Sequence, residues 1–313
     1  MGGGRPLADR AHALFARLQD EICSEIERID GGRFREDPWQ YLPTTGRGAG
    51  GGRTRILTDG ALIEKGGVNL SAIEGELSPR LAERLRVTAQ PFYATGVSLV
   101  LHPQSPMVPT VHLNLRYLEL RGEEGDGPRR AWFGGGSDLT PYYLFEEDAR
   151  QFHASLKPAC DAYEPGAYAR FKRACDEYFF LRHRGEARGV GGVFFDYLER
   201  DLERALGLVR DVGHAFCEAW PPIAERRRVE AWGEAERAWQ LVRRGRYVEF
   251  NLIHDRGTLF GLETEGRTES ILMSLPPLVR WVYDHNPPAA SREAALVDVL
   301  RHPREWMGSD SAQ

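Results

Sequence analysis

The chain has 313 residues, 42% of them hydrophobic, and its 41 Lys and Arg face 46 Asp and Glu, for a net charge of −5. A chain of this length and composition buries a substantial core, which excludes a disordered segment and a small disulfide-stapled module. Charges of both signs are intermixed and no apolar run approaches about 18 residues, so neither a nucleic-acid partner nor a membrane span is predicted. Four widely spaced cysteines without a C-x-x-C pair predict reduced thiols and a cytosolic protein.

The first part of the chain predicts one helix followed by hairpins. Apolar residues recur at helical spacing over residues 7–29, and Asp30-Gly31-Gly32 ends the run. Short β-type runs at 54–57, 61–64 and 68–72 are separated by glycine-containing turns, which predicts antiparallel pairing. The Gly-rich stretch 46–52 contains a G-x-G-x-x-G match, but it lacks the strand before and the helix after that a dinucleotide site requires. We therefore expect a surface loop there.

Strands, then helices, then strands again are predicted over the rest of the chain. Strand patterns at 96–102, 111–120 and 131–133 are followed by helical spacing at 145–158, 165–183 and 201 to about 243. Strand signals return at 246–253 and 258–263, and a short helix follows Pro276-Pro277. This order predicts an α+β fold, with the late strands completing the early sheet in a single domain over residues 1–313 and a flexible tail from about 305 to 313.

A row of polar side chains is predicted on one strand face. In VHLNLRYLEL, period-2 alternation puts His112, Asn114 and Arg116 on one face and the apolar residues between them on the other. Such a row favours a cleft that binds an anion, and the alternative is an ordinary solvated surface. Ser98 and His102, four residues apart on the preceding strand, share a face in the same way.

Two glycine-rich segments carry charged residues. WFGGGSDLTPYY is predicted to be a functional loop, because its three glycines exceed what a turn needs, and Asp138 on it can orient a group or accept a proton; a simple hairpin turn is the alternative. HRGEARGVGGVFFD places His183, Arg184, Arg188 and Asp196 among apolar residues, where a ligand or a structural ion-pair network must satisfy them.

The last motif, GRYVEFNLIHDRGTLFGLETEGRTESILMSLPP, is predicted to form a strand with Tyr247, Glu249 and Asn251 on one face. Arg256 and Arg267 bracket the hairpin expected after it.

Together, GVSLVLHP, VPTVHLNLRY, WFGGGSDLTPYY, HRGEARGVGGVFFD and this last motif closely resemble the oxygen-dependent coproporphyrinogen III oxidase family over about residues 34–283. The resemblance implies an antiparallel sheet of about seven strands flanked by helices on both faces, and a cytoplasmic homodimer. It also implies oxidative decarboxylation of two propionates of coproporphyrinogen III to vinyl groups, giving protoporphyrinogen IX, CO2 and hydrogen peroxide in haem synthesis.

The resemblance also implies roles for individual residues. The proton donor is His112, and the proposed ligands of a divalent metal, manganese or a similar ion, are His102, His112, His153 and His183. Substrate contacts are implied at Ser98, Asn114, Leu115, Arg116, Arg184, Glu265, Gly266 and Arg267. Asp138 and a pair formed by Arg184 and Asp196 are implied to hold the tetrapyrrole. Ala174 and Glu265 depart from the family pattern, which has Trp and Gly there.

The implied chemistry agrees with the residues. A substrate with four carboxylates needs placed arginines on a net-acidic chain, and a carboxylate such as Asp196 or Asp138 can accept bonds from its pyrrole N–H groups. We expect Asp196 to be the more critical of the two, and Asp138, on its glycine loop, to be freer to move. Molecular oxygen is the expected co-substrate, and no flavin, haem or nicotinamide motif is visible. A metal-dependent oxygenase of another substrate and a non-catalytic tetrapyrrole carrier remain alternatives.

Overall fold

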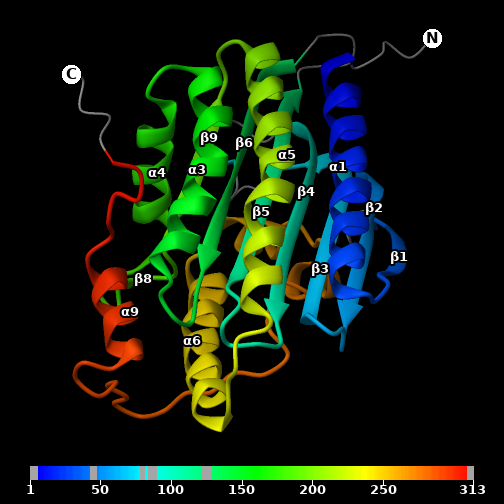
Figure 1. Ribbon diagram of the computed structural model, residues 1–313. Helices are drawn as coiled ribbons and strands as arrows, with labels where there is room; N and C mark the ends of the chain where they lie inside the picture. The colour runs from blue at the N-terminus through cyan, green and yellow to red at the C-terminus, as the bar shows by residue number, and fades with distance from the viewer. Residues whose placement is uncertain (1–5, 43–47, 78–81, 84–89, 122–127, 309–313) are drawn as a thin grey trace.

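The structure, a computed structural model, describes residues 6–42, 48–77, 82–83, 90–121 and 128–308. Its centre is an antiparallel seven-stranded sheet in the order β1-β2-β3-β4-β5-β6-β9 (Figure 1). The strands are β1 (Arg35–Gln40), β2 (Gly48–Thr58), β3 (Ile63–Glu76), β4 (Pro91–Pro103), β5 (Thr110–Arg121), β6 (Pro128–Thr140) and β9 (Gly192–Leu198). A separate two-stranded ribbon pairs β7 (Phe180–Leu181) with β8 (Glu186–Ala187). The α+β fold with an antiparallel sheet is therefore confirmed.

Four helices cover one face of the sheet: α1 (Pro6–Asp30), α3 (Glu146–Tyr163), α4 (Ala167–Tyr178) and α5 (Leu202–Arg227). Figure 1 shows them side by side in front of the strands. The predicted N-terminal helix over 7–29 is confirmed as α1. Its apolar stripe packs on the sheet, and the buried Gln19 amide donates to the carbonyls of Arg53 (2.7 Å) and Val68 (2.9 Å) on β2 and β3.

The other face is covered by α6 (Glu234–Ile253), α7 (Arg256–Glu263) and α8 (Thr268–Leu272), with α9 (Arg292–Arg301) further along the chain. The ring of Phe260 on α7 packs edge-on against that of Phe92 on β4, with ring centroids 6.2 Å apart. The hydroxyl of Ser270 on α8 forms a hydrogen bond of 2.7 Å with the hydroxyl of Thr54 on β2. Helices on both faces are thus confirmed.

The predicted late strands are wrong. Residues 246–253 are the second half of α6, and 258–263 belong to α7. The segment lacks period-2 alternation of burial, because Tyr247, Val248, Glu249, Phe250 and Asn251 are all buried in succession. β9 completes the sheet instead, and the helix predicted over 201 to about 243 is divided between α5 and α6.

Both glycine-rich segments predicted to be loops are strands. Residues 48–52 of the expected surface loop begin β2, whereas 46–47 lie outside the described residues. Gly52 lies under the Trp39 indole, where a Cβ would approach a ring carbon to 2.4 Å, so glycine lets the two strands pair. Gly134, Gly135 and Gly136 lie within β6.

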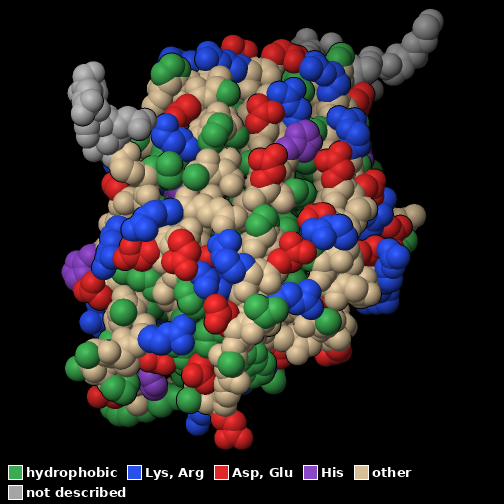
Figure 2. All heavy atoms as spheres, viewed as in Figure 1, with side chains coloured by type: hydrophobic (Ala, Val, Ile, Leu, Met, Phe, Trp, Pro, Cys, Tyr) green, Lys and Arg blue, Asp and Glu red, His purple; other side chains and the backbone are tan. Residues whose placement is uncertain are grey.

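The expected flexible tail is also corrected at Trp306. Its side chain is buried and donates to the carbonyl of Val190 at 2.9 Å, while residues 309–313 lie outside the description. No helix in the described part of the chain is long and apolar enough to cross a membrane. Figure 2 shows acidic and basic side chains intermixed over the face that carries α1, α3 and α5, as the sequence predicts.

Candidate active site

The polar row of β5 lies on the sheet face beneath α6 and α7. His112 and Arg116 keep 19% and 33% of their side chains exposed, whereas Leu113 and Leu115 are fully buried on the opposite face. The predicted alternation is confirmed. It also means that Leu115, implied as a substrate contact, contributes no side chain to this face, because it packs near Gly213 of α5.

His112 and Asp138 form a hydrogen-bonded pair across neighbouring strands. They lie opposite each other in the β5–β6 register, and His112 Nδ1 is 2.7 Å from Asp138 Oδ1. Because a carboxylate only accepts, Nδ1 carries the proton when this bond forms, which leaves Nε2 as the lone-pair atom of the neutral ring. His112 is partly exposed, and its Nε2 has no hydrogen-bond partner among the described residues. The pair therefore presents this one ring nitrogen to a ligand.

Asp138 is not a mobile loop residue. Its carboxylate is 2% exposed and accepts two bonds from Arg188 Nη2, at 2.8 and 2.9 Å. Burial opposes ionisation of Asp138, but Arg188 and His112 outweigh it and lower the pKa of this carboxyl. Asp138 thus stays an anion that orients His112.

Arg188 is held by an aromatic cage. Its guanidinium lies over the rings of Phe179 (4.1 Å), Tyr247 (4.5 Å) and Phe250 (4.9 Å). A further bond of 2.8 Å joins Nη1 to Asn251 Oδ1. Contacts from α6 therefore fix the cation that holds Asp138.

A second ion pair lies on β9. Asp196 Oδ2 is 2.9 Å from Arg116 Nη2 and 3.7 Å from Arg256 Nη2 at the start of α7. Gly134 lies directly beneath, since a Cβ there would be 2.6 Å from Asp196 Oδ1 and 2.9 Å from Arg116. A glycine at this point of β6 therefore makes room for the pair.

The implied pairing of Arg184 with Asp196 is wrong. Arg184 makes a bidentate pair with Glu249 of α6, at 2.7 and 2.9 Å, because the β7–β8 turn lies beside that helix. Glu249 also accepts from His183 (2.8 Å) and Trp281 (3.0 Å). Burial works against its charge, but these donors prevail and lower the pKa of Glu249 to about 2.

The four histidines implied as metal ligands are held by different partners. His102 bonds Thr110 and the Ser274 carbonyl, and His153 bonds Tyr168 and the Val190 carbonyl, so both ring nitrogens of each are engaged. Burial lowers the pKa of both rings, for His153 to about 3. His183 bonds Glu249 and His254.

No group of three or more His, Cys, Asp and Glu suited to a metal ion occurs in the ranges that the structure describes. These histidines therefore do not fit one shared divalent metal.

The implied contacts at 265–267 lie elsewhere on the sheet. Arg267 pairs with Asp37 of β1 at 2.7 Å, at the opposite edge from β9. Glu265 has φ +56°, in the left-handed region that the glycine of the family pattern adopts without steric cost. Ser98 is half-buried opposite Asn114, beside the polar row. The structure therefore unites His112, Asn114, Arg116, Asp138 and Asp196 on one face but not the turn at 265–267.

The sequence of this chain matches a family of known enzymes. A model of the coproporphyrinogen III oxidase family covers residues 10–306. The chain belongs to this family. Oxygen-dependent coproporphyrinogen-III oxidases of Synechococcus sp. (strain CC9605) and Parasynechococcus marenigrum (strain WH8102) are 47% and 48% identical to it, over 97% of this chain and 88% of each relative. That of Prochlorococcus marinus (strain MIT 9313) is 48% identical over 95% of this chain and 90% of its own.

Several residues around the site escaped the sequence prediction. The sequence gives no signal for Asp255 or Tyr178. It predicts a ligand or an ion-pair network around Arg188 and a hairpin beside Arg256, but not the pairing of Arg188 with Asp138 or the place of Arg256 beside Asp196. An arginine next to a glycine-rich apolar run, as Arg188 is before Gly189-Val190-Gly191-Gly192, is the one local signal of a buried ion pair. The others become visible only when α4, α7 and β9 are in place.

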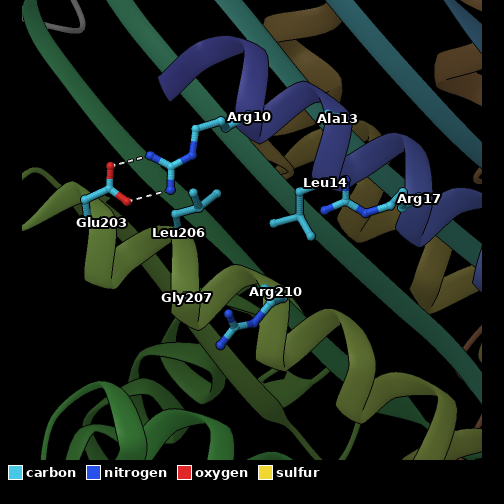
Figure 3. Close-up of a pocket in the computed structure, with 8 residues that line it drawn as sticks. All are labelled: Arg10, Ala13, Leu14, Arg17, Glu203, Leu206, Gly207 and Arg210. Carbon is cyan, nitrogen blue, oxygen red and sulfur yellow. Dashed lines mark hydrogen bonds and ion pairs between the residues drawn. The ribbon is translucent and has the colours of Figure 1, made fainter. Parts of the chain in front are cut away.

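A pocket on the opposite side of the sheet contains none of these residues. It has a volume of about 380 Å³ and lies between α1 and α5, where Arg10 and Glu203 pair across it (Figure 3). Its lining combines apolar side chains, Leu14 and Leu206 among them, with two further arginines, Arg17 and Arg210. In this member of the coproporphyrinogen III oxidase family, the candidate site residues His112, Arg116 and Asp196 lie together on the face under α6 and α7.

Proposed function

We propose that this protein is an oxygen-dependent coproporphyrinogen III oxidase. Each of two propionates loses CO2 and two hydrogens to become a vinyl group, and O2 takes the two electrons and two protons to become hydrogen peroxide. The observation that carries the proposal is the partly exposed group His112, Arg116 and Asp196 on one sheet face, in a chain 47% identical to enzymes of that name.

The substrate-binding part of the proposal rests on charge. The substrate offers carboxylates and pyrrole N–H donors, and the face offers both complementary kinds of group. Arg116 and Arg256 bind propionates, and Asp196 between them accepts pyrrole N–H bonds. Asn114, which accepts from Arg116 at 2.8 Å, sets the direction of that guanidinium.

The proton-transfer part rests on the pair of His112 and Asp138. With Nδ1–H held by the carboxylate, Nε2 takes or gives a proton at the reacting side chain. Electrons pass from the electron-rich tetrapyrrole to oxygen without a flavin, haem or nicotinamide.

We also propose a cytoplasmic homodimer, as the resemblance implies. Supporting residues are large exposed apolar side chains at the end of α6 and after α8: Leu252, Ile253, Leu278, Trp281 and Tyr283.

The test is incubation of the purified protein with coproporphyrinogen III in air and under nitrogen. We expect a divinyl dicarboxylate product only in air, with one CO2 and one hydrogen peroxide per propionate. Binding without product would make the protein a tetrapyrrole carrier. Product formation that a chelator abolishes and manganese restores would make it a metal-dependent enzyme.

A further inference from the structure

We propose that Tyr178 is a positioning residue of this site: its hydroxyl holds the start of α7 so that Arg256 faces Asp196. The inference rests on the proposed function. It adds to that function the residue that fixes the position of Arg256, one of the two arginines proposed to bind propionates.

Tyr178 is the last residue of α4 and lies flat against β9. Its ring stacks on Phe194 with centroids 4.2 Å apart and planes 8° apart. Its hydroxyl donates to Asp255 Oδ1 at 2.8 Å and accepts from the backbone N–H of Arg256 at 3.0 Å. Burial raises the pKa of Tyr178, so the hydroxyl keeps the proton that it donates.

Asp255 connects this hydroxyl to the first turn of α7. It is the N-cap residue, and its Oδ2 accepts from the backbone N–H and the hydroxyl of Thr258, both at 2.8 Å. One carboxylate oxygen therefore caps the helix while the other is bound to Tyr178. The position and direction of the first residue of α7, Arg256, depend on this pair of contacts.

Arg256 completes the chain of contacts. Its guanidinium lies 4.8 Å over the Tyr178 ring and 5.5 Å over that of Phe194, and 41% of its side chain is exposed. Arg116 is bound to Asp196 at 2.9 Å, whereas Arg256 stands 3.7 Å from the same carboxylate. Arg256 is thus the less committed cation and the better placed to receive a substrate carboxylate.

The decisive variant is Tyr178→Phe, which keeps the ring stack and removes only the hydroxyl. The matched control is Tyr143→Phe, which removes another hydroxyl bond, to Glu293 at 2.7 Å, away from this face. We expect Tyr178→Phe to raise KM for coproporphyrinogen roughly fivefold to tenfold with kcat within about twofold, and the control to leave KM unchanged. Amide hydrogen exchange over residues 256–259 should quicken in Tyr178→Phe alone.

A merely structural hydroxyl would lower the amount of folded enzyme and hence kcat, leaving KM unchanged, and that result would overturn the proposal. A second test uses Arg256→Gln: if Tyr178 acts through Arg256, adding Tyr178→Phe to that variant raises KM no further. Independent, multiplying effects would also overturn it. A wild-type protein that makes no product refutes the proposed function, and the exchange of the α7 amides still decides whether Tyr178 holds that helix.

Discussion

Asp138 and Asp196 lie on the same face of the sheet in different surroundings. Asp138 is enclosed by Arg188 and His112, whereas Asp196 is 15% exposed between Arg116 and Arg256. From the sequence, Asp196 is predicted to be the more critical residue for turnover, because Asp138 is expected to lie on a mobile glycine-rich loop. That reason is wrong, since Asp138 is a buried residue of β6. The greater role of Asp196 in turnover stays a prediction, because Asp196 is the more exposed carboxylate and lies between two arginines.

We expect Asp196→Asn to lower turnover about 10²-fold, because it removes the anion that accepts pyrrole N–H bonds while leaving the fold intact. Asp138→Asn leaves Arg188 buried without its carboxylate, which should cost about 3–5 kcal/mol of stability. Turnover per folded molecule and urea unfolding measure the two effects. An Asp138→Asn protein as stable as wild type, yet less active than Asp196→Asn, would contradict both parts.

His153 predicts an acid sensitivity of the fold. Burial lowers its pKa from 6.5 to about 3 in the folded state, so the folded protein binds this proton less readily than the unfolded chain does. The stability it contributes is complete above about pH 6.5 and is lost as the pH falls toward 3; between about pH 7 and pH 4 the loss is about 3 kcal/mol.

Urea unfolding of wild type and His153→Gln over that range checks the effect. The variant should lose less stability than wild type by about that amount. His302→Gln, at an exposed histidine, should follow the wild-type curve. Identical pH dependence in wild type and His153→Gln would refute the prediction.

At the scale of elements, the hydrophobic pattern predicts α1 and the strands β4 and β5 well, because each has one buried face and a clear period. The two short strands predicted at 61–64 and 68–72 are wrong as separate elements, because Gly66 and Gly67 lie inside the continuous strand β3 and pair with β4 instead of forming a turn. The pattern fails at α6, where the five consecutive residues 247–251 are buried and include Tyr, Val and Phe, the residues typical of a strand. It fails at β2 and β6 because their glycines signal turns locally, while the need for glycine comes from Trp39 and from the ion pair over Gly134.

Two glycines allow a matched test of this account. Gly50 in β2 has φ +112°, and a Cβ there would be 2.1 Å from the Ala72 carbonyl oxygen. Gly207 lies inside α5, where a Cβ would meet nothing within 4 Å. We expect Gly50→Ala to destabilise the protein by about 2 kcal/mol or more, and Gly207→Ala to stabilise it by up to about 1 kcal/mol. Urea unfolding decides, and equal effects of the two substitutions would count against the strand assignment of residues 48–52.

At the scale of the whole molecule, the sequence predicts the fold class and the polar row of β5, but not the pairs that make the site. Asp138 and Arg188 are 50 residues apart. Asp196 is bound by Arg116 of β5, with Arg256 of α7 farther away, rather than by Arg184, which is closer in sequence. Such pairs depend on how β9, α6 and α7 cross the sheet, and no local periodicity encodes that. The histidines show the same limit, since a shared ligand set inferred from family resemblance is divided among separate hydrogen-bond networks.

The exposed apolar segment after α8 predicts how two copies associate. Leu278 is 56% exposed and Tyr283 is 99% exposed, close in sequence to Trp281, which bonds Glu249. Large apolar side chains gathered in this way are typical of an interface.

We expect wild type to sediment at twice the 35.3 kDa chain mass at micromolar concentration, and Leu278→Asp combined with Tyr283→Asp to sediment as a monomer. The control is Val229→Asp, since Val229 is 81% exposed on the turn between α5 and α6, away from this segment in the chain. It should leave the dimer intact. A wild-type monomer, or dissociation by Val229→Asp alone, would refute this interface.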